Sequence, residues 1–538
     1  MKRRGFLKAS AAGCALALVE PVSSFSETKE STITPPAFEL EEMSVSELQQ
    51  GMQSGKYSSR SLVEKYVDRI NDIDKRGPAL NSVIELNPDA ESTAAALDKE
   101  RKDKGPRGPL HGIPILIKDN IDTADRMKTT AGSLALLSSR PPQDASVARK
   151  LRDAGAVILG KTNLSEWANI RSSKSSSGWS GRGGQTKNPY VLDRNPCGSS
   201  SGSGAAPAAN LCAAAIGTET DGSVVCPSNA NSLVGIKPTL GLISRAGIIP
   251  IAHSQDTAGP MARTVADAAT LLGALTGQDP RDPVTNESRG KSFTDYTRFL
   301  DPNALSGARL GIVRKNFGFN DRVDRLMNDL IAKMKRKGAV VIDPVVIPTA
   351  GKFDDSELEV LLYELKADLN AYLATLGPQA PVKSLKDIIE FNEKNRDREM
   401  PYFGQDLFIK AQEKGPLTTP AYLNALRKNH LMSRTQGIDL VLKQHRLDAL
   451  IAPTGGPAWP TDLVNGDHFT GGYSTASAVA GYPHITVPAG YVLGLPVGLS
   501  FFAGAYSEPK LISIAFAFEQ ATKARRPPKF LPTADLSL

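Results

Sequence analysis

The residues of this chain whose types could carry out chemistry are one lysine and a set of serines that lie next to glycines. Lys118 ends the apolar segment 113–118, where desolvation would disfavour the charged form of its side chain. Ser223 ends Gly217-Thr-Glu-Thr-Asp-Gly-Ser223, where successive backbone N–H groups could converge as an oxyanion hole. Serines also fill Gly198-Ser-Ser-Ser-Gly-Ser-Gly204. A nucleophilic serine, a bridging serine and a neutral lysine together make a proton relay.

The Gly/Ser-rich segment 172–204 admits other interpretations. Its composition is typical of a linker, but it lies between segments expected in the core, and an Ala-rich helix is predicted to begin within it and run to Ala215. A phosphate-binding loop does not fit, because Gly-x-x-x-x-Gly-Lys-Ser/Thr is absent. Gly198-Ser-Ser-Ser-Gly202 matches Gly-x-Ser-x-Gly, but a nucleophile elbow needs a hydrophobic strand directly before it, and the turn-forming stretch 188–196 precedes this motif. We therefore interpret the segment as a functional loop.

The elements that must position these residues are strands and helices that alternate along the chain. Apolar runs predict strands at 113–118, 156–160, 309–313, 339–342, 449–451 and 485–488. Apolar periodicity and capping residues predict helices at 44–54, 59–74, 89–104, 145–154, 322–337 and 356–376. This succession predicts an α/β fold with a central mixed, mostly parallel β-sheet covered by helices on both faces. We expect one domain from residue 38 to residue 538.

The N-terminus has the pattern of an export signal. Arg3 and Arg4 are followed by Gly-Phe-Leu-Lys, an apolar stretch at 9–19 and small residues at 22–24, and the paired arginines predict a twin-arginine signal over 1–26. Residues 27–37 are polar with a double proline and predict a flexible leader. We expect an exported protein, periplasmic or extracellular. The exact cleavage site, and lipidation at Cys14, stay open.

Charge and hydropathy exclude two classes of partner. The net charge is +7, and the 64 basic and 57 acidic residues are well mixed, so nucleic acid is not an expected partner. The apolar stretch of the signal is too short to span a bilayer, and no other window has 18 uninterrupted apolar residues, so we expect no integral membrane segment.

Cysteine and histidine usage argues against a disulfide framework and against a metal. Once Cys14 leaves with the signal, Cys197, Cys212 and Cys226 remain, and an odd number of cysteines is not a framework. We expect them to be small buried hydrophobes. The chain has no Cys-x-x-Cys pair and six scattered histidines, so we predict neither a metal site nor a cofactor.

Taken together, the motifs resemble those of the amidase signature family, over about residues 38–527. They are Gly108 to Asn120, Thr129 to Ser133, Gly160 to Trp167, Gly198 to Gly204, Gly217 to Ser223, Gly235 to Thr239 and Asp256 to Arg263. Within the family the chain is most similar to bacterial peptide amidases, through 163–169, 177–185, 217–223, 247–251 and 254–257.

The resemblance implies a role for each residue of the relay. Ser223 would be the nucleophile, Ser199 the bridging serine preceded by a cis peptide bond, Lys118 the base, and Ser200 a supporting hydrogen-bond partner. The oxyanion hole would be formed by the N–H groups of Thr220, Asp221, Gly222 and Ser223. The chain departs from many members of the family at two positions, because Cys197 and Asp221 stand where glycine is usual; the peptide amidases share the second departure.

We therefore expect a serine-dependent amide hydrolase that releases ammonia from carboxamides, with C-terminal peptide amides as the substrate class and an acyl-enzyme intermediate. We expect it to act as a monomer. For Lys118 to act as a base at neutral pH, its pKa must fall by about 3 units from about 10.4. By analogy with the family, residues 352–480, with Trp459 and segment 466–473, would shape the pocket.

Three alternatives stay open at this point. The first is an amidase of small acyl or aryl amides with esterase side activity. The second is the glutaminase subunit of a transfer-RNA amidotransferase, from whose partners an exported chain would be separated. The third is a serine-rich binding protein that has lost catalysis; turnover of a simple amide would exclude it.

Overall fold

The computed structural model describes residues 36–536. The strands are β1 (Val83–Leu86), β2 (Pro114–Lys118), β3 (Val157–Thr162), β4 (Trp179–Ser180), β5 (Gly184–Gln185), β6 (Ala214–Glu219), β7 (Val234–Lys237), β8 (Thr257–Ala262), β9 (Arg309–Ile312), β10 (Val340–Ile342), β11 (Ala449–Pro453), β12 (His484–Val492) and β13 (Leu495–Phe502). The α-helices are α1 (Val45–Gln53), α2 (Ser59–Arg69), α3 (Ala90–Lys104), α4 (Ser146–Asp153), α5 (Ser201–Ala208), α6 (Val225–Ala230), α7 (Val265–Leu275), α8 (Asp321–Arg336), α9 (Asp354–Thr375), α10 (Leu385–Lys394), α11 (Arg396–Glu399), α12 (Asp406–Gln412), α13 (Pro420–His430), α14 (Asp439–His445), α15 (Thr475–Ala480) and α16 (Glu508–Thr522).

One sheet contains all of these strands except β4 and β5, in the order β1-β3-β2-β6-β8-β7-β12-β13-β11-β9-β10. β3, β2 and β6 are mutually parallel, as are β11, β9 and β10. The edge strand β1 and the strands between these two blocks pair antiparallel. The predicted mixed α/β sheet is confirmed, with parallel pairing confined to the two blocks. The centre is antiparallel in part because only residues 493–494 connect β12 to β13, too few for a crossover.

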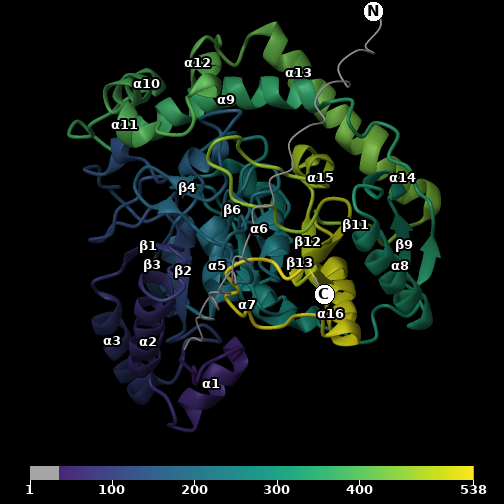
Figure 1. Ribbon diagram of the computed structural model, residues 1–538, viewed down its shortest axis with the longest axis horizontal. Coiled ribbons are helices and arrows are strands. Elements are labelled where there is room, and N and C mark those ends of the chain that lie inside the picture. Colours follow the sequence, from purple (N-terminus) through teal and green to yellow (C-terminus); the bar gives the residue numbers. More distant parts are fainter. Residues whose placement is uncertain (1–35, 537–538) are drawn as a thin grey trace, which may run out of the picture. The chain divides into compact units, whose positions relative to one another are not determined.

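Helices cover both faces of this sheet, as predicted. Strands β2, β3, β6, β8, β11 and β13 are buried at every position, which requires neighbours on both of their faces. One hydrophobic core joins these strands with residues of α2, α3, α4, α7, α8 and α16. Figure 1 shows the strands running from β1, β3 and β2 on one side to β11 and β9 on the other.

Helices α9 to α13 form a layer of their own. Leucines of α9 pack with Trp167, Ile249 and residues of α10 and α12 in a second hydrophobic cluster, and α9, α12 and α13 lie along the same side of the sheet (Figure 1). Tyr372 of α9 donates a hydrogen bond to Asp122 Oδ1 at 2.8 Å. This layer therefore packs on the loops that follow the sheet strands.

One predicted element is wrong at its C-terminal end. The helix expected to run to Ala215 ends at Ala208, and residues 214–219 form β6 instead. Asn210 adopts a left-handed conformation with φ +60°, which stops the helix. β6 then lies between β2 and β8, so its backbone groups are satisfied by both neighbouring strands.

The predicted signal, 1–26, and nearly all of the predicted leader lie outside the described residues. Within residues 36–536, no helix is both long and apolar enough to cross a bilayer.

Candidate active site

Lys118 lies at the C-terminal end of β2 and is fully buried. Its Nζ lies 2.8 Å from Ser199 Oγ and 2.9 Å from Thr218 Oγ1, and the carbonyl oxygen of Thr218 is 3.3 Å away. Thr218 belongs to β6, which pairs directly with β2, so the sheet itself places these groups together. Burial lowers the pKa of Lys118 to about 7. The amine is thus available in its neutral form near neutral pH.

The loop that carries Ser199 is held against β6 by the next serine. The Gly198–Ser199 peptide bond is cis. Ser200 Oγ donates to the carbonyl oxygen of Thr218 at 3.0 Å and accepts from the backbone N–H of Thr218 at 3.1 Å. The contact requires glycine at position 217, because a Cβ there would lie 2.7 Å from Ser200 Oγ.

Ser223 lies in the turn between β6 and α6, with 8% of its surface exposed. Its carbonyl oxygen accepts a hydrogen bond from the N–H of Ser200 at 3.3 Å. Within residues 36–536, no hydrogen bond joins the hydroxyls of Ser199 and Ser223. The structure thus brings Lys118 and Ser199 into direct contact and places Ser223 next to their loop.

The turn before Ser223 presents unpaired backbone donors. The N–H groups of residues 220–223 donate to no other residue of the described part of the chain. Gly222 has φ +79°, a conformation that glycine adopts without steric cost. Free N–H groups on a tight turn are the donors that an oxyanion hole needs.

Glu219, which was not predicted as a site residue, supports this turn through hydrogen bonds to the backbone that follows Ser223. Its Oε2 accepts hydrogen bonds from the N–H groups of Val224 and Val225, the first residues of the α6 turn. The buried ammonium group of Lys237 opposes the rise that burial causes in the pKa of Glu219. The signal was available in the sequence, since Glu219 lies inside the motif that ends at Ser223.

Hydrogen bonds to two other segments also hold the turn at 220–223. Thr220 Oγ1 donates to Asp256 Oδ1 at 2.6 Å, and Thr475 Oγ1 donates to Asp221 Oδ2 at 2.7 Å. Glu357 of α9 lies against Asp221, and burial together with this second carboxylate raises the pKa of Glu357 well above its usual value. The closeness of the two carboxyl groups therefore favours the protonated form of Glu357.

A cavity of about 310 Å³ opens beside this turn. Gly198, Asp221 and Gly222 line it on the side of the serines, and the aromatic rings of Trp459, Phe469 and Tyr473 line it elsewhere. Trp459 and residues of segment 466–473, which were expected to shape the pocket, do line this cavity. The predicted contribution of the helical part of 352–440 is wrong for this cavity, which α9 to α13 do not line.

Polar residues complete the wall. Each lies in a segment that the sequence singles out, at 163–169, 177–185 or 466–473, but none was predicted individually. The cavity is lined by Asn169, Ser177 and Asp467. Asp467 accepts hydrogen bonds from the N–H of Ser177 at 3.0 Å and from Trp459 Nε1 at 3.2 Å, and so ties the aromatic wall to the Gly/Ser-rich loop. No local pattern marks the contact of Asp467 with Ser177, because these two residues are 290 positions apart.

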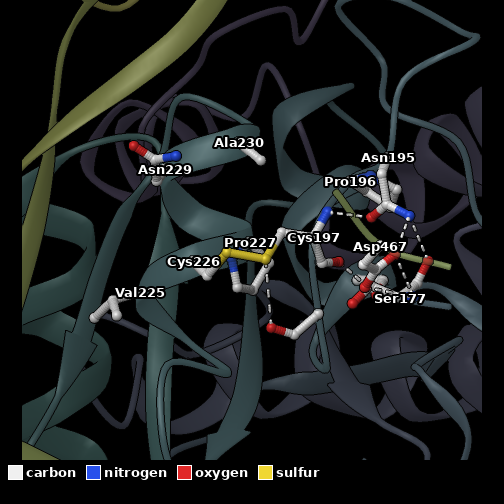
Figure 2. The surroundings of a disulfide bond; sticks show 12 residues. Ser177, Asn195, Pro196, Cys197, Val225, Cys226, Pro227, Asn229, Ala230 and Asp467 are labelled. Atoms are coloured by element: carbon white, nitrogen blue, oxygen red, sulfur yellow. Dashed lines mark hydrogen bonds between the residues drawn. A yellow bond between two sulfur atoms is a disulfide. The ribbon is translucent and has the colours of Figure 1, made fainter. Parts of the chain in front are cut away.

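A disulfide bond joins Cys197 to Cys226 at the edge of the cavity (Figure 2). The prediction that every cysteine is an unpaired hydrophobe is therefore wrong for these two. It is confirmed for Cys212, which is fully buried and free, and whose pKa burial raises to about 12. The odd count hid the pair, because only the folded chain brings α6 next to the residue before Gly198.

One group of described residues has the ligand types of a metal site: His253, Glu364 and Asp368, whose ligand atoms lie within 4.8 Å of one another. His253 Nδ1 is 2.9 Å from Asp368, and Glu364 accepts hydrogen bonds from Tyr422 and from the N–H of Ser254. The hydrogen bond with Asp368 raises the pKa of His253. These contacts fit an ion-pair network that fastens loop 251–256 to α9.

Comparison with known proteins agrees with this arrangement. The profile of the amidase family matches residues 61–512, so the chain belongs to the amidase signature family. A probable amidase of Arabidopsis thaliana is 44% identical over 524 residues, 96% of each chain. The crystal structure of native peptide amidase from Stenotrophomonas maltophilia superposes with a TM-score of 0.88 at 51% identity, covering 92% of this chain and 100% of that one. A complex of the peptide amidase PAM with the competitive inhibitor chymostatin gives a TM-score of 0.89 at 52% identity, covering 91% and 100%.

Membership of this family makes the protein an amidase, a hydrolase of carboxamide C–N bonds.

Proposed function

We propose that this amidase hydrolyses the C-terminal carboxamide of peptides, releasing ammonia, with Ser223 as nucleophile, Ser199 as bridging serine and Lys118 as base. The observation that carries the proposal is the contact of 2.8 Å between the buried amine of Lys118 and Ser199 Oγ, next to a turn with four unpaired N–H groups. Desolvation lowers the pKa of that amine to about 7, so the neutral form is well populated at neutral pH.

The contacts of Lys118 suit a neutral amine, which has two N–H donors and one lone pair. Thr218 can accept both N–H groups, through Oγ1 and its carbonyl oxygen. The lone pair is then directed at the hydroxyl of Ser199. Ser199 can pass its proton to Lys118 and take up the proton of Ser223, so that Thr218 orients the base.

The reaction then follows in two stages. Ser223 Oγ attacks the carboxamide carbon while the N–H groups of residues 220–223 hold the developing negative charge. The proton held by Lys118 returns through Ser199 to the nitrogen, the C–N bond breaks, and ammonia leaves an acyl group on Ser223. Water enters along the same path and attacks the acyl carbon while its proton passes to the relay; the ester bond to Ser223 Oγ then breaks, Ser223 takes the proton back from the relay, and the acid is released.

Two observations support a peptide as the acyl part of the substrate. The cavity of about 310 Å³ has both aromatic and polar walls, the combination that a peptide side chain and its amide groups require. Half of the residues are identical in peptide amidases of known structure, one of which binds chymostatin as a competitive inhibitor.

The test of substrate class is mass spectrometry on one amidated peptide. We expect the terminal –NH2 to be replaced by –OH, with ammonia released and no backbone fragments. The same peptide with a free C-terminal acid is the control and should stay intact. Preferential internal cleavage would contradict the proposal, and turnover confined to small acyl or aryl amides and esters would favour the first alternative.

We further propose export through the twin-arginine route, on the basis of Arg3 and Arg4 in the sequence. Replacing both by lysine should retain the protein in the cytoplasm, folded and active. The control is Lys2→Arg, which leaves the pair intact. Unchanged accumulation of the double variant outside the cytoplasm would contradict this route.

A further inference from the structure

We propose that the disulfide between Cys197 and Cys226 positions the relay, by holding the loop of Ser199 against the helix that follows Ser223. Its reduction should therefore slow the reaction of a protein that stays folded. This inference rests on the proposed function, because it assumes that these two serines act together.

Each cysteine of the disulfide lies within three residues of one of the two serines. Cys197 is two residues before Ser199, and Cys226 is three residues after Ser223, in α6. The Cα atoms of the two cysteines are 6.0 Å apart. Figure 2 shows the bond between the loop of Asn195 and Pro196 and the helix of Val225 and Pro227. A covalent link at this place fixes the separation of two segments that approach the site from different elements.

Few other bonds fix that separation directly. The N–H of Ser200 donates to the carbonyl oxygen of Ser223 at 3.3 Å, and Asn231 Nδ2 donates to the carbonyl oxygen of Pro196 at 2.9 Å. The alignment of the two hydroxyls therefore depends on how closely the backbones are held. A displacement of about 1 Å in a catalytic group can cost about 100-fold in rate.

The backbone conformation of Cys197 indicates that a cysteine is present there for the disulfide. Its φ is +58°, in the left-handed region that glycine adopts without penalty and that a residue with a Cβ does not. Neighbouring groups hold it in this conformation, since its N–H donates to Asn195 Oδ1 and its carbonyl oxygen accepts from Ser201 Oγ. Cysteine at a position suited to glycine is explained by the bond that it makes.

The bond can be reached through the substrate cavity. Both cysteines line that cavity, and Cys226 is partly exposed whereas Cys197 is buried. A thiolate of dithiothreitol can attack one sulfur and displace the other as a thiolate, and the second thiol of the reagent then closes its ring. Dithiothreitol loses two electrons, and each cysteine sulfur gains one electron and a proton.

The experiment compares the full-length protein in its oxidised and reduced states, with a peptide amide as substrate. Alkylation followed by intact mass measurement counts thiols, and complete reduction should add two. We expect kcat to fall about tenfold or more, KM to change less than threefold, and near-UV and far-UV circular dichroism to stay native. Reoxidation with glutathione disulfide should restore kcat.

Two variants separate the disulfide from other effects of the reductant. The double variant Cys197→Gly with Cys226→Ala, which suits the left-handed position, should show the low kcat of the reduced protein and no response to dithiothreitol. If it does not fold, Cys197→Ser with Cys226→Ser replaces it. The matched control is Cys212→Ala, which should respond as the wild type does.

Equal kcat before and after verified reduction would overturn the positioning role. So would loss of the near-UV signal in step with activity, because the disulfide would then serve stability alone. Both results differ from a failure of the proposed function. In that case the oxidised wild type would release no ammonia from peptide amides.

Discussion

The proposed relay and the wall of the cavity beside it are built in different ways. Lys118 and Ser199 are fully buried, and each is fixed by strands or a loop of the central sheet. The wall consists of loop residues from distant parts of the chain, and Phe469 at its rim is 51% exposed. The first region has hydrogen bonds along neighbouring strands, and the second depends on single contacts such as that of Asp467 with Trp459.

From this difference we expect chemistry and selectivity to depend on separate parts of the fold. Burial supplies the low-dielectric environment that a neutral lysine requires, so the relay cannot move to the surface. A wall of loops can change without disturbing the sheet, which is where differences in substrate range are expected. Changes in the relay should therefore affect kcat for every amide, and changes in the wall should affect KM for large ones.

The largest effect is expected at Ser223. Its replacement by alanine should lower kcat by about 10⁴-fold or more, and Ser199→Ala and Lys118→Ala should leave only a trace, because the three act as a unit. Ammonia release from a peptide amide and from a simple amide should fall alike. The control is Ser228→Ala in α6, whose hydroxyl has no partner within residues 36–536. Retention of a tenth of the activity by Ser223→Ala would refute the assigned nucleophile.

The next effect is the pH dependence of the relay. Lys118 accepts a proton only when it is neutral, and its pKa is about 7. Activity should therefore fall as the pH falls through 7, by about tenfold in kcat/KM for each further unit, and level off above it. The measurement is kcat/KM between pH 5 and pH 9 with a neutral substrate. If kcat/KM kept rising in proportion to the hydroxide concentration up to pH 9, the pKa of Lys118 would not be lowered to about 7.

A smaller and more selective effect is expected in the wall. Asp467→Asn replaces one acceptor oxygen by a donor, so the N–H of Ser177 or of Trp459 loses its partner. A buried bond to a charged group is worth about 1.5–3 kcal/mol, and partial exposure reduces it, so we expect about a tenfold rise in KM for peptide amides. KM for a simple amide, and kcat for both, should change little. Asp462→Asn in the same loop is the control; an equal loss with both substrates would remove the distinction between wall and relay.

No effect is expected from chelators. In the proposed mechanism the relay and the turn at 220–223 supply the nucleophile, the base and the oxyanion donors, so EDTA or phenanthroline should leave the rate of ammonia release unchanged. Addition of zinc to the untreated protein serves as the control. If chelation abolished activity and only zinc restored it, a metal would take part in the mechanism, and the proposed relay would not be sufficient for catalysis.

Local patterns predicted those parts of the fold that depend on neighbouring residues. The helix at 44–54 appears as α1 with Ser44 as its cap, and the predicted strand at 113–118 is β2. The Ala-rich stretch at 205–215 contains no local pattern that shows where its helix ends. Its composition suits a helix throughout, but the helix ends at Ala208, and residues 214–215 pair with β2 and β8 as the start of β6.

The sequence by itself determined the family, the mixed α/β sheet and the positions of Lys118, Ser199 and Ser223, because each lies in a short motif whose chemistry is local. Tertiary structure alone decided how far apart these groups lie, that Thr218 holds the lysine, and that Asp467 closes the wall. It also decided the disulfide, since two cysteines 29 residues apart carry no local sign of pairing. Burial and long-range contacts arise only when distant segments pack, and the same packing lowers the pKa of Lys118 to about 7.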